Sequence, residues 1–369
     1  MSGGVQFPGA PANLYAGPAY GTLGDVLANT SAVRQQISLL TEQSASGKVS
    51  ASYAGLGFGA TTSLSLDPVL AQQQTWQSNI DAATGTMNVA QTALSQISQI
   101  ASSFYAQTNT LNGLDAGTTD NVAAAARAAL QQVAGLLDTK DGNVYVFAGQ
   151  DSTNPPVPNP DAILSSGFAM QISAAVGGLA ASGAAATSAA TLAVASSNAA
   201  GTSPFSTALS QPPTALAALR TTVNVGAQQS LAAGIVASGN ADVPSAGPST
   251  TGSYMRDILR SLATLGSLSS SQNSMPGFAG LVADTRSALS GAITALNGDA
   301  GAMGDRQTQL QTIKTGIAST STALQAQVSG TEDVDMAKTL SNLSAAQTQL
   351  TASYQLIAAL QGLSLTKFL

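Results

Sequence analysis

Apolar positions near the start of the chain recur at alternating spacings of four and three residues. The series contains Val26, Thr30, Val33, Ile37, Leu40 and Ser44. This is the spacing of a coiled-coil seam, so we expect a helix here, with Gly47 as its stop. Residues 49–68 are rich in Gly and Ser, and we expect a loop or a small irregular lobe there.

A longer periodic run follows. Its members are Gln73, Trp76, Ile80, Ala83, Met87, Ala90, Leu94, Ile97, Ala101, Phe104, Thr108 and Leu111. The run predicts a helix over about 69–111, roughly 60 Å long at ~1.5 Å per residue. Helices of this length are typical of rods and bundles. A further, alanine-rich helix is expected from Val122 to Leu137.

The middle of the chain changes period. Asp141-Gly142 predicts a turn, and Val144 to Phe147 has the character of a strand. Over about 151–250 the composition shifts to Ala, Ser, Thr and Gly, with low complexity near 172–203. The segment TTVNVGA (221–227) is the one clear strand that the pattern predicts in this part.

Helical periodicity resumes at SYMRDILRSLATL (253–265), and two more seams follow. One contains Leu310, Ile313, Ile317, Thr320, Leu324 and Gln327. The other contains Met336, Leu340, Leu343, Gln347, Leu350, Tyr354 and Ile357. Gly330 is expected to end a helix between them. The sequence thus predicts a mainly α fold: long antiparallel coiled-coil helices from both chain ends form a rod, with a small strand- and turn-rich insertion in the middle.

The amino-acid composition argues against several classes of function. Charged residues make up only 8% of the 369, against about 25% in ordinary domains, so we expect much of the surface to contact other copies or partners. A net charge of −6 argues against a nucleic-acid partner. His and Cys are both absent from the sequence, which removes disulfides, imidazole bases, Cys nucleophiles and most zinc sites.

Three carboxylates in TEDVDMAKTL (331–340) are conspicuous in such a weakly charged chain: Glu332, Asp333 and Asp335. A metal site needs more oxygen ligands, and an acid–base pair needs a partner base. We therefore expect a helix N-cap cluster, in which the acids complement the helix dipole and Ser329 pairs with Glu332 in a capping box.

Other candidate chemistry is weaker. GLGFGA (55–60) matches a dinucleotide-binding pattern, but no strand precedes it and no alternating βα pattern follows, so a flexible turn is expected. We expect no cofactor and no metal. The N-terminus has no positively charged segment followed by an apolar one, and no apolar run reaches about 18 residues. Neither a cleavable secretory signal nor membrane insertion is expected.

Several segments, in this order, resemble the bacterial flagellin family. They are ISLLTEQSASGKVSAS (37–52), SNIDAATGTMNVAQTALSQISQI (78–100), GAMGDRQTQLQTI (301–313) and the chain end from TEDVDMAKTLSNLSAAQTQL onward (331–369). The resemblance covers about 20–150 and 250–369. Within the family, DTKDGNVYVFAGQDSTNPPV (138–157) is similar to the hook-associated branch that joins hook to filament.

The resemblance implies a structural subunit of the extracellular flagellum, exported without a cleaved signal peptide. Its expected partners are copies of itself, other hook-associated proteins, flagellin and a cytoplasmic export chaperone. The ends of the chain are expected to be disordered alone and to fold when neighbours bury them. The assembly interface is expected to consist of Val26, Val33, Ile37, Leu40, Met336, Leu340, Leu343, Leu350, Tyr354, Ile357 and Leu360.

Five parts are expected from this comparison: an N-terminal assembly helix (1–48), the N-terminal part of an inner rod (49–150), a variable outer lobe (151–250), the C-terminal part of the rod (251–330) and a C-terminal assembly helix (331–369). Filament flagellin proper remains an alternative, as does a signal-less secreted helical translocator or adhesin. An enzyme in the 151–250 lobe is disfavoured, because that lobe has no His, no Cys and very few carboxylates.

Overall fold

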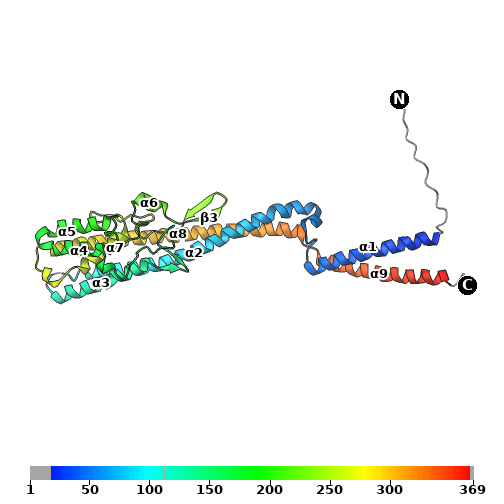
Figure 1. The fold of residues 1–369 in the computed structure, drawn as a ribbon, viewed down its shortest axis with the longest axis horizontal. Coiled ribbons are helices and arrows are strands. Elements are labelled where there is room, and N and C mark those ends of the chain that lie inside the picture. The colour runs from blue at the N-terminus through cyan, green and yellow to red at the C-terminus, as the bar shows by residue number, and fades with distance from the viewer. Residues whose placement is uncertain (1–17, 112, 366–369) are drawn as a thin grey trace, which may run out of the picture. The chain divides into compact units, whose positions relative to one another are not determined.

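The structure is a computed structural model that describes residues 18–111 and 113–365, with side chains from 24 onward to 359. Its contacts divide the chain into two compact units. Unit 1 comprises Met1–Ala71 and Thr320–Leu369, and unit 2 comprises Gln72–Ser319. The long helices α2 (Ala60–Gln107) and α8 (Phe278–Glu332) contribute residues to both units (Figure 1). The expected mainly α fold, with long helices, is confirmed.

Unit 1 is built around α1 (Pro18–Ser46) and α9 (Met336–Leu365), which pack against each other. Helix α1 ends where Gly47 takes a φ of +71°, a backbone conformation that glycine adopts without strain. The predicted helix stop at Gly47 is therefore confirmed. The short 3-10 helix η1 (Tyr53–Gly59) follows and leads directly into α2.

Helix α2 begins at Ala60, so the prediction of a loop over all of 49–68 is wrong for its last nine residues. Pro68 lies inside the helix, where it removes one backbone hydrogen bond. Small side chains bring this part of α2 close to the end of α8. Ser63 is fully buried beside Thr331, and a Cβ on Gly59 would lie 3.2 Å from the Thr331 Cβ.

Unit 2 holds most of the shorter elements. Its helices are α3 (Ala116–Leu137), η2 (Ile163–Ser165), α4 (Gly167–Gly177), α5 (Leu179–Ser196), α6 (Pro213–Ala218), α7 (Tyr254–Gly266) and η3 (Ser270–Gln272). Strand β1 (Lys140–Asp141) pairs antiparallel with β2 (Val144–Tyr145), and β3 (Thr222–Gly226) pairs antiparallel with β4 (Gln229–Ala232).

The 151–250 region differs from its expected strand- and turn-rich character, because the low-complexity stretch forms α4 and α5. Alanine has the highest helix propensity, and Ser166 caps α4 by accepting a hydrogen bond from the Ala169 N–H. The helical geometry of α5 breaks at Gly183, where φ is +75°. The expected strand at 221–227 is confirmed as β3, but its partner β4 was not predicted.

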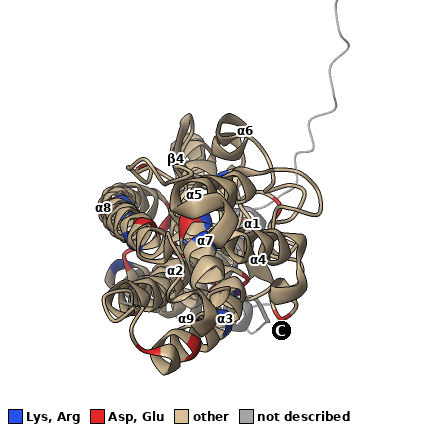
Figure 2. Ribbon diagram, turned by 90° about the vertical axis from the view of Figure 1, so that its left-hand side faces the viewer, with Lys and Arg blue, Asp and Glu red and all other residues tan. Residues whose placement is uncertain are grey.

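Helix α7 is buried on every side, against α3, α4 and α5. Its charged residues Arg256, Asp257 and Arg260 are buried with its apolar ones. Figure 2 shows red and blue ribbon beside the α7 label. Arg260 pairs with Asp284 of α8 at 2.9 Å and donates to Thr191 Oγ1 of α5 at 3.0 Å. These contacts join three helices through one guanidinium group.

Among the described residues, α5 has the length and apolar composition of a membrane-spanning helix. Two observations assign it to the core of unit 2 instead. Its first residue, Leu179, is fully buried, and Arg260 donates to the buried Thr191 side chain and to the Ser188 backbone carbonyl. A core helix of this composition passes the same test of length and hydropathy.

Candidate functional site

The contact between α1 and α9 is a narrow apolar seam. Its buried members are Val33, Leu40 and Ala346, with Ile37, Leu343 and Leu350 packed against them. On α1, the predicted seam agrees with the structure: Thr30 is buried and Val26 is half-buried. As the residue number rises along α1, the contacting number falls along α9, so the two helices are antiparallel.

The seam on α9 is rotated from the predicted one. The side chains turned toward the pair are Thr339, Leu343, Ala346, Leu350, Ser353 and Ile357. Met336, Leu340 and Tyr354, which were expected in the seam, are 39%, 50% and 42% exposed. The small side chains of Ala346 and Thr339 let α1 approach on their side of α9. The side chain of Leu360 lies outside the described residues.

A short backbone bridge fixes the register of the two helices at one end. The Val49 N–H donates to the Glu332 carbonyl at 2.6 Å, and the Val334 N–H donates to the Gly47 carbonyl at 3.0 Å. Lys48 Nζ lies 2.8 Å from Asp333 Oδ1 and 3.2 Å from Glu332 Oε2. Hydrogen bonding to Lys48 lowers the pKa of the Asp333 carboxyl, and the same contact raises the pKa of Lys48.

The carboxylates of Glu332, Asp333 and Asp335 therefore have different roles. Only Asp335 caps α9, since its Oδ1 accepts from the Lys338 N–H at 3.1 Å. The expectation that Glu332 and Asp333 join this cap is wrong, because both pair with Lys48 at the end of α8. The expected helix end at Gly330 is also wrong: α8 continues to Glu332. An interior glycine costs a helix about 1 kcal/mol, which a helix of 55 residues tolerates.

Farther along the pair, Arg34 holds the exposed aromatic ring of Tyr354. Its Nε donates to the Tyr354 hydroxyl at 2.7 Å, and its guanidinium carbon lies 5.4 Å from the ring centroid. This cation–π contact covers one face of the ring and leaves the other side of the residue open.

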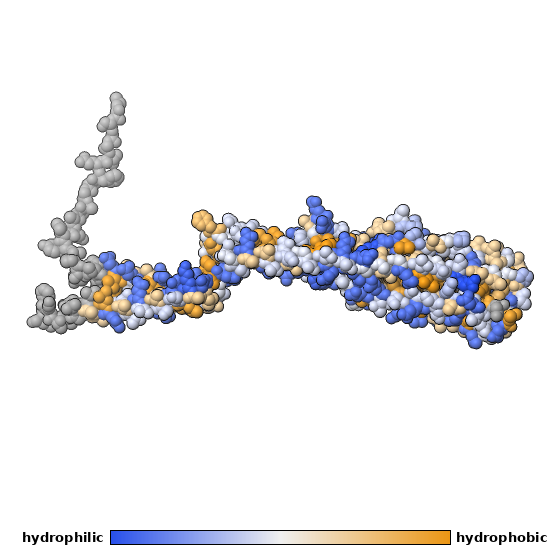
Figure 3. Space-filling model, turned by 180° about the vertical axis from the view of Figure 1, so that it is seen from behind, coloured by the Kyte–Doolittle hydropathy of each residue, from blue (hydrophilic) through white to orange (hydrophobic). Residues whose placement is uncertain are grey.

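Large apolar side chains remain exposed on both helices of the pair. They are Leu27 and Leu39 on α1, and Met336, Leu340, Tyr354 and Leu356 on α9. In Figure 3 apolar surface is visible along this pair. We name Met336, Leu340 and Tyr354 the open flank of α9. The sequence placed these three residues in an interface, but its periodicity did not tell which side of α9 meets α1.

No chemical site competes with this surface in the described residues. No group of three or more Asp and Glu side chains is placed there to hold a metal ion. The GLGFGA segment forms η1 and the start of α2 rather than the turn of a βαβ unit. The arrangement is suited to packing against other helices.

A comparison with known protein families matches residues 287–369 to the bacterial flagellin C-terminal helical region. The matched part contains most of α8 and all of α9, and thus the open flank. The comparison with curated proteins gave no match.

Flagellins are structural proteins of the extracellular flagellum that polymerise into filaments. The long helices of the structure agree with the matched helical region. The match covers the C-terminal 83 of the 369 residues, and it supports a structural flagellar subunit of the bacterial flagellin family.

Proposed function

We propose that the chain polymerises with its neighbours through α1 and α9, as a hook-associated protein that joins hook to filament. The observation that carries the proposal is the open flank of α9. Burying a large apolar side chain contributes roughly 1.5–3 kcal/mol. The three side chains are 39–50% exposed, so covering the rest of their surface in each copy contributes a part of that free energy and favours association.

The sides of the α1–α9 pair have different roles in this proposal. The seam of Val33, Leu40 and Ala346 is satisfied within one chain. The open flank, Leu27 and Leu39 keep apolar surface that is exposed to solvent in the single chain. Neighbouring copies would cover that surface, in agreement with the low charge of the chain.

The experiment is a pair of lysine substitutions. Leu340→Lys places a charge on the open flank, at a half-exposed position where the folded chain accommodates it. We expect this variant to fold normally by circular dichroism and to fail in assembly, measured by sedimentation and by swimming of the cell. Met170→Lys, at a similarly exposed position in unit 2, is the matched control and should assemble. Normal filaments from Leu340→Lys would overturn the proposed interface.

The seam needs a separate substitution. Leu350→Lys and Ile357→Lys change residues turned toward the pair, so both variants are expected to separate α1 from α9 and to lose assembly as a consequence. Comparing them with Leu340→Lys distinguishes a loss of folding in unit 1 from a loss of contact between copies.

The junction role rests on the segment 138–157, which forms β1, β2 and the turns after them. Filament flagellin is the second candidate, because the matched C-terminal region is common to flagellins. Immunogold labelling of detached flagella separates the two. A junction protein gives one band beside the hook, and a filament protein is labelled along its length.

Before assembly, the exposed apolar side chains of the open flank must be shielded from solvent and from other copies. We infer that a cytoplasmic export chaperone binds the open flank until the chain is exported from the cell. Other hook-associated proteins and flagellin would be its neighbours afterwards. The expected five-part organisation, with assembly helices over 1–48 and 331–369, belongs to the same proposal. Co-purification of the chaperone with the wild-type chain but not with Leu340→Lys would support this step.

A further inference from the structure

Phe58 is wholly exposed, with a relative accessibility of 103%, although it is one of the largest apolar side chains of the chain. It lies in η1, where the chain turns before α2. Gly57 precedes it with φ +57° and ψ −123°, a conformation that other residues rarely adopt. The segment is also held in place, because the Tyr53 hydroxyl donates to Asp67 Oδ2 at 2.8 Å. The ring is thus presented outward by a defined turn.

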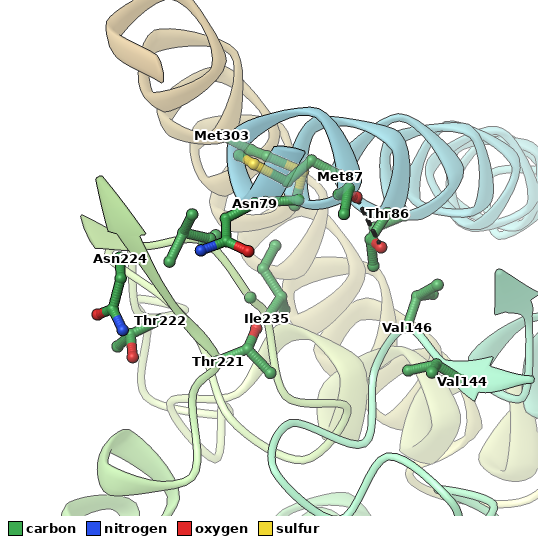
Figure 4. Close-up of a pocket in the computed structure, with 16 residues that line it drawn as sticks. Asn79, Thr86, Met87, Val144, Val146, Thr221, Thr222, Asn224, Ile235 and Met303 are labelled. Carbon is green, nitrogen blue, oxygen red and sulfur yellow. Dashed lines mark hydrogen bonds between the residues drawn. The ribbon is translucent and has the colours of Figure 1, made fainter. Parts of the chain in front are cut away.

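Unit 2 contains an open cavity of about 370 Å³ that fits such a ring (Figure 4). It lies among α2, β2, β3 and α8, and its sixteen described lining residues include no charged side chain. Met87 and Met303 are buried at its floor, and the half-exposed Val144 lies at its rim. Cavities of about 150 Å³ already hold a benzene molecule, so this one has room for a phenyl ring and its stem.

The chemistry of the cavity also favours an aromatic occupant. Met87 and Met303 are only 2% and 0% exposed, so they lie behind the cavity surface, and their flexible side chains would repack to contact an inserted ring. Thr86 also lines the cavity, and its hydroxyl donates to Asp141 Oδ2 at 2.8 Å. The other polar lining side chains are those of Asn79, Thr221, Thr222 and Asn224, which lie beside the apolar ones.

We propose that Phe58 of one copy inserts into the Met87–Met303 cavity of the next copy in the assembly. The inference rests on the proposed function, since it requires copies of this chain to lie side by side. It adds a second contact, separate from the open flank of α9. Because the ring and its cavity are different surfaces of one chain, the contact is heterologous, and its repetition builds an open series of copies.

The absence of Cys from the sequence allows a direct test. A Phe58→Cys chain is mixed with a Val144→Cys chain and oxidised, once as assembled material and once as dilute monomer. A disulfide forms only where the two Cα atoms approach within roughly 4.4–6.8 Å. We expect a crosslinked dimer in the assembled sample alone. A mixture of Met170→Cys with Val144→Cys is the control, and it should give little crosslinking.

Removing the ring gives an independent measurement. Phe58→Ser should leave the fold unchanged by circular dichroism, because the side chain contacts solvent in the lone chain. It should raise the concentration needed for assembly roughly ten- to a hundred-fold. Met170→Ser should leave that concentration unchanged.

The outcomes separate the inference from the proposed function. If wild-type and Phe58→Ser chains assemble at the same concentration, or if crosslinking stays at the control level in assembled material, the Phe58 contact is overturned while assembly stands. A crosslink of Phe58→Cys to a different flagellar protein, in place of Val144→Cys, would overturn the self-contact too. If the wild-type chain never assembles and Leu340→Lys changes nothing, the proposed function fails and the inference falls with it.

Discussion

The two units differ in how completely each buries its own apolar side chains. In unit 2, large apolar residues such as Leu94, Leu130, Tyr254 and Phe278 are essentially fully buried in one continuous core. In unit 1, the described buried apolar residues are Val33, Leu40, Val328 and Ala346, and each keeps some exposure. Exposed large apolar side chains show the opposite distribution, since most of them lie in unit 1.

The charged side chains of the two units also differ in how deeply they are buried. Unit 2 buries Arg256 and Arg260, each of which donates four hydrogen bonds, while the ion pairs of Lys48 in unit 1 lie at the surface. Buried charges of this kind are tolerated only within a complete, well-packed structure. We infer that unit 2 has a continuous core of its own, and that unit 1 leaves exposed apolar side chains which contacts with other copies would cover.

The largest expected effect comes from deleting a buried charge. Arg260→Met removes the partner of Asp284 and four donated hydrogen bonds, and should destabilise unit 2 by about 3–5 kcal/mol. Urea unfolding followed by the fluorescence of Trp76, the chain's only tryptophan and a residue of unit 2, measures it. The matched change in unit 1, Lys48→Met, should have no measurable effect on folding. Equal effects would contradict the distinction.

A second comparison uses leucines. Leu94→Ala in the unit 2 core should cost about 2–5 kcal/mol, since the cavity left behind is closed on all sides. Leu40→Ala should cost roughly 1–2 kcal/mol in the lone chain, because its seam is narrow and water reaches the gap. Hydrogen exchange resolved by peptide reports both units in one experiment. The cost of Leu40→Ala should increase in assembled material, where neighbours exclude that water.

Acid should act on the units in opposite directions and over different pH ranges. Burial raises the pKa of the Asp138 carboxyl in unit 2 from 3.8 to about 6. The folded state then binds this proton more tightly than the unfolded state, so unit 2 gains stability as the pH falls from 7 toward 4. The gain should be about 1–2 kcal/mol, because the group is only half-buried and solvent screens the rest.

The carboxyl of Asp333 in unit 1 has a lowered pKa, so its contribution is present above the usual range of Asp. That contribution is lost only as the pH falls below 3.8, through the lowered pKa of the folded state. Thermal unfolding between pH 7 and pH 3 measures both trends. Asp138→Asn should abolish the gain in unit 2, and the idea is wrong if the gain survives that substitution.

The smallest effects compare two glycines of unit 1. Gly47→Ala should destabilise the end of α1 by about 1 kcal/mol, since its φ of +71° strains any other residue. Gly330→Ala should stabilise α8 by about 0.5–1 kcal/mol, because Gly330 is helical and an added Cβ meets nothing within 4 Å. Circular dichroism during thermal unfolding detects both changes. A loss of stability in Gly330→Ala would restore the predicted helix end there.

The spacing of apolar residues along the chain was enough to predict much of the secondary structure. The four–three spacing identified α1, most of α2 and α9, and the alternating segment 221–227 identified β3. Gly47 was recognisable as a helix end because a positive φ is a property of the residue itself. The start of α2 was missed because Pro68 is normally a boundary, and contacts with Thr331 of α8, far away in the sequence, extend the helix beyond it.

By itself the sequence determined which helices exist, which of their faces are apolar, and that the chain ends resemble flagellin. Only the tertiary structure decided which side of α9 meets α1, that Lys48 takes two of the three carboxylates, and that η1 presents Phe58 to solvent. The reason is physical. Helical periodicity arises between neighbours three and four residues apart, whereas the choice of contact side depends on the sizes and charges of side chains hundreds of residues away.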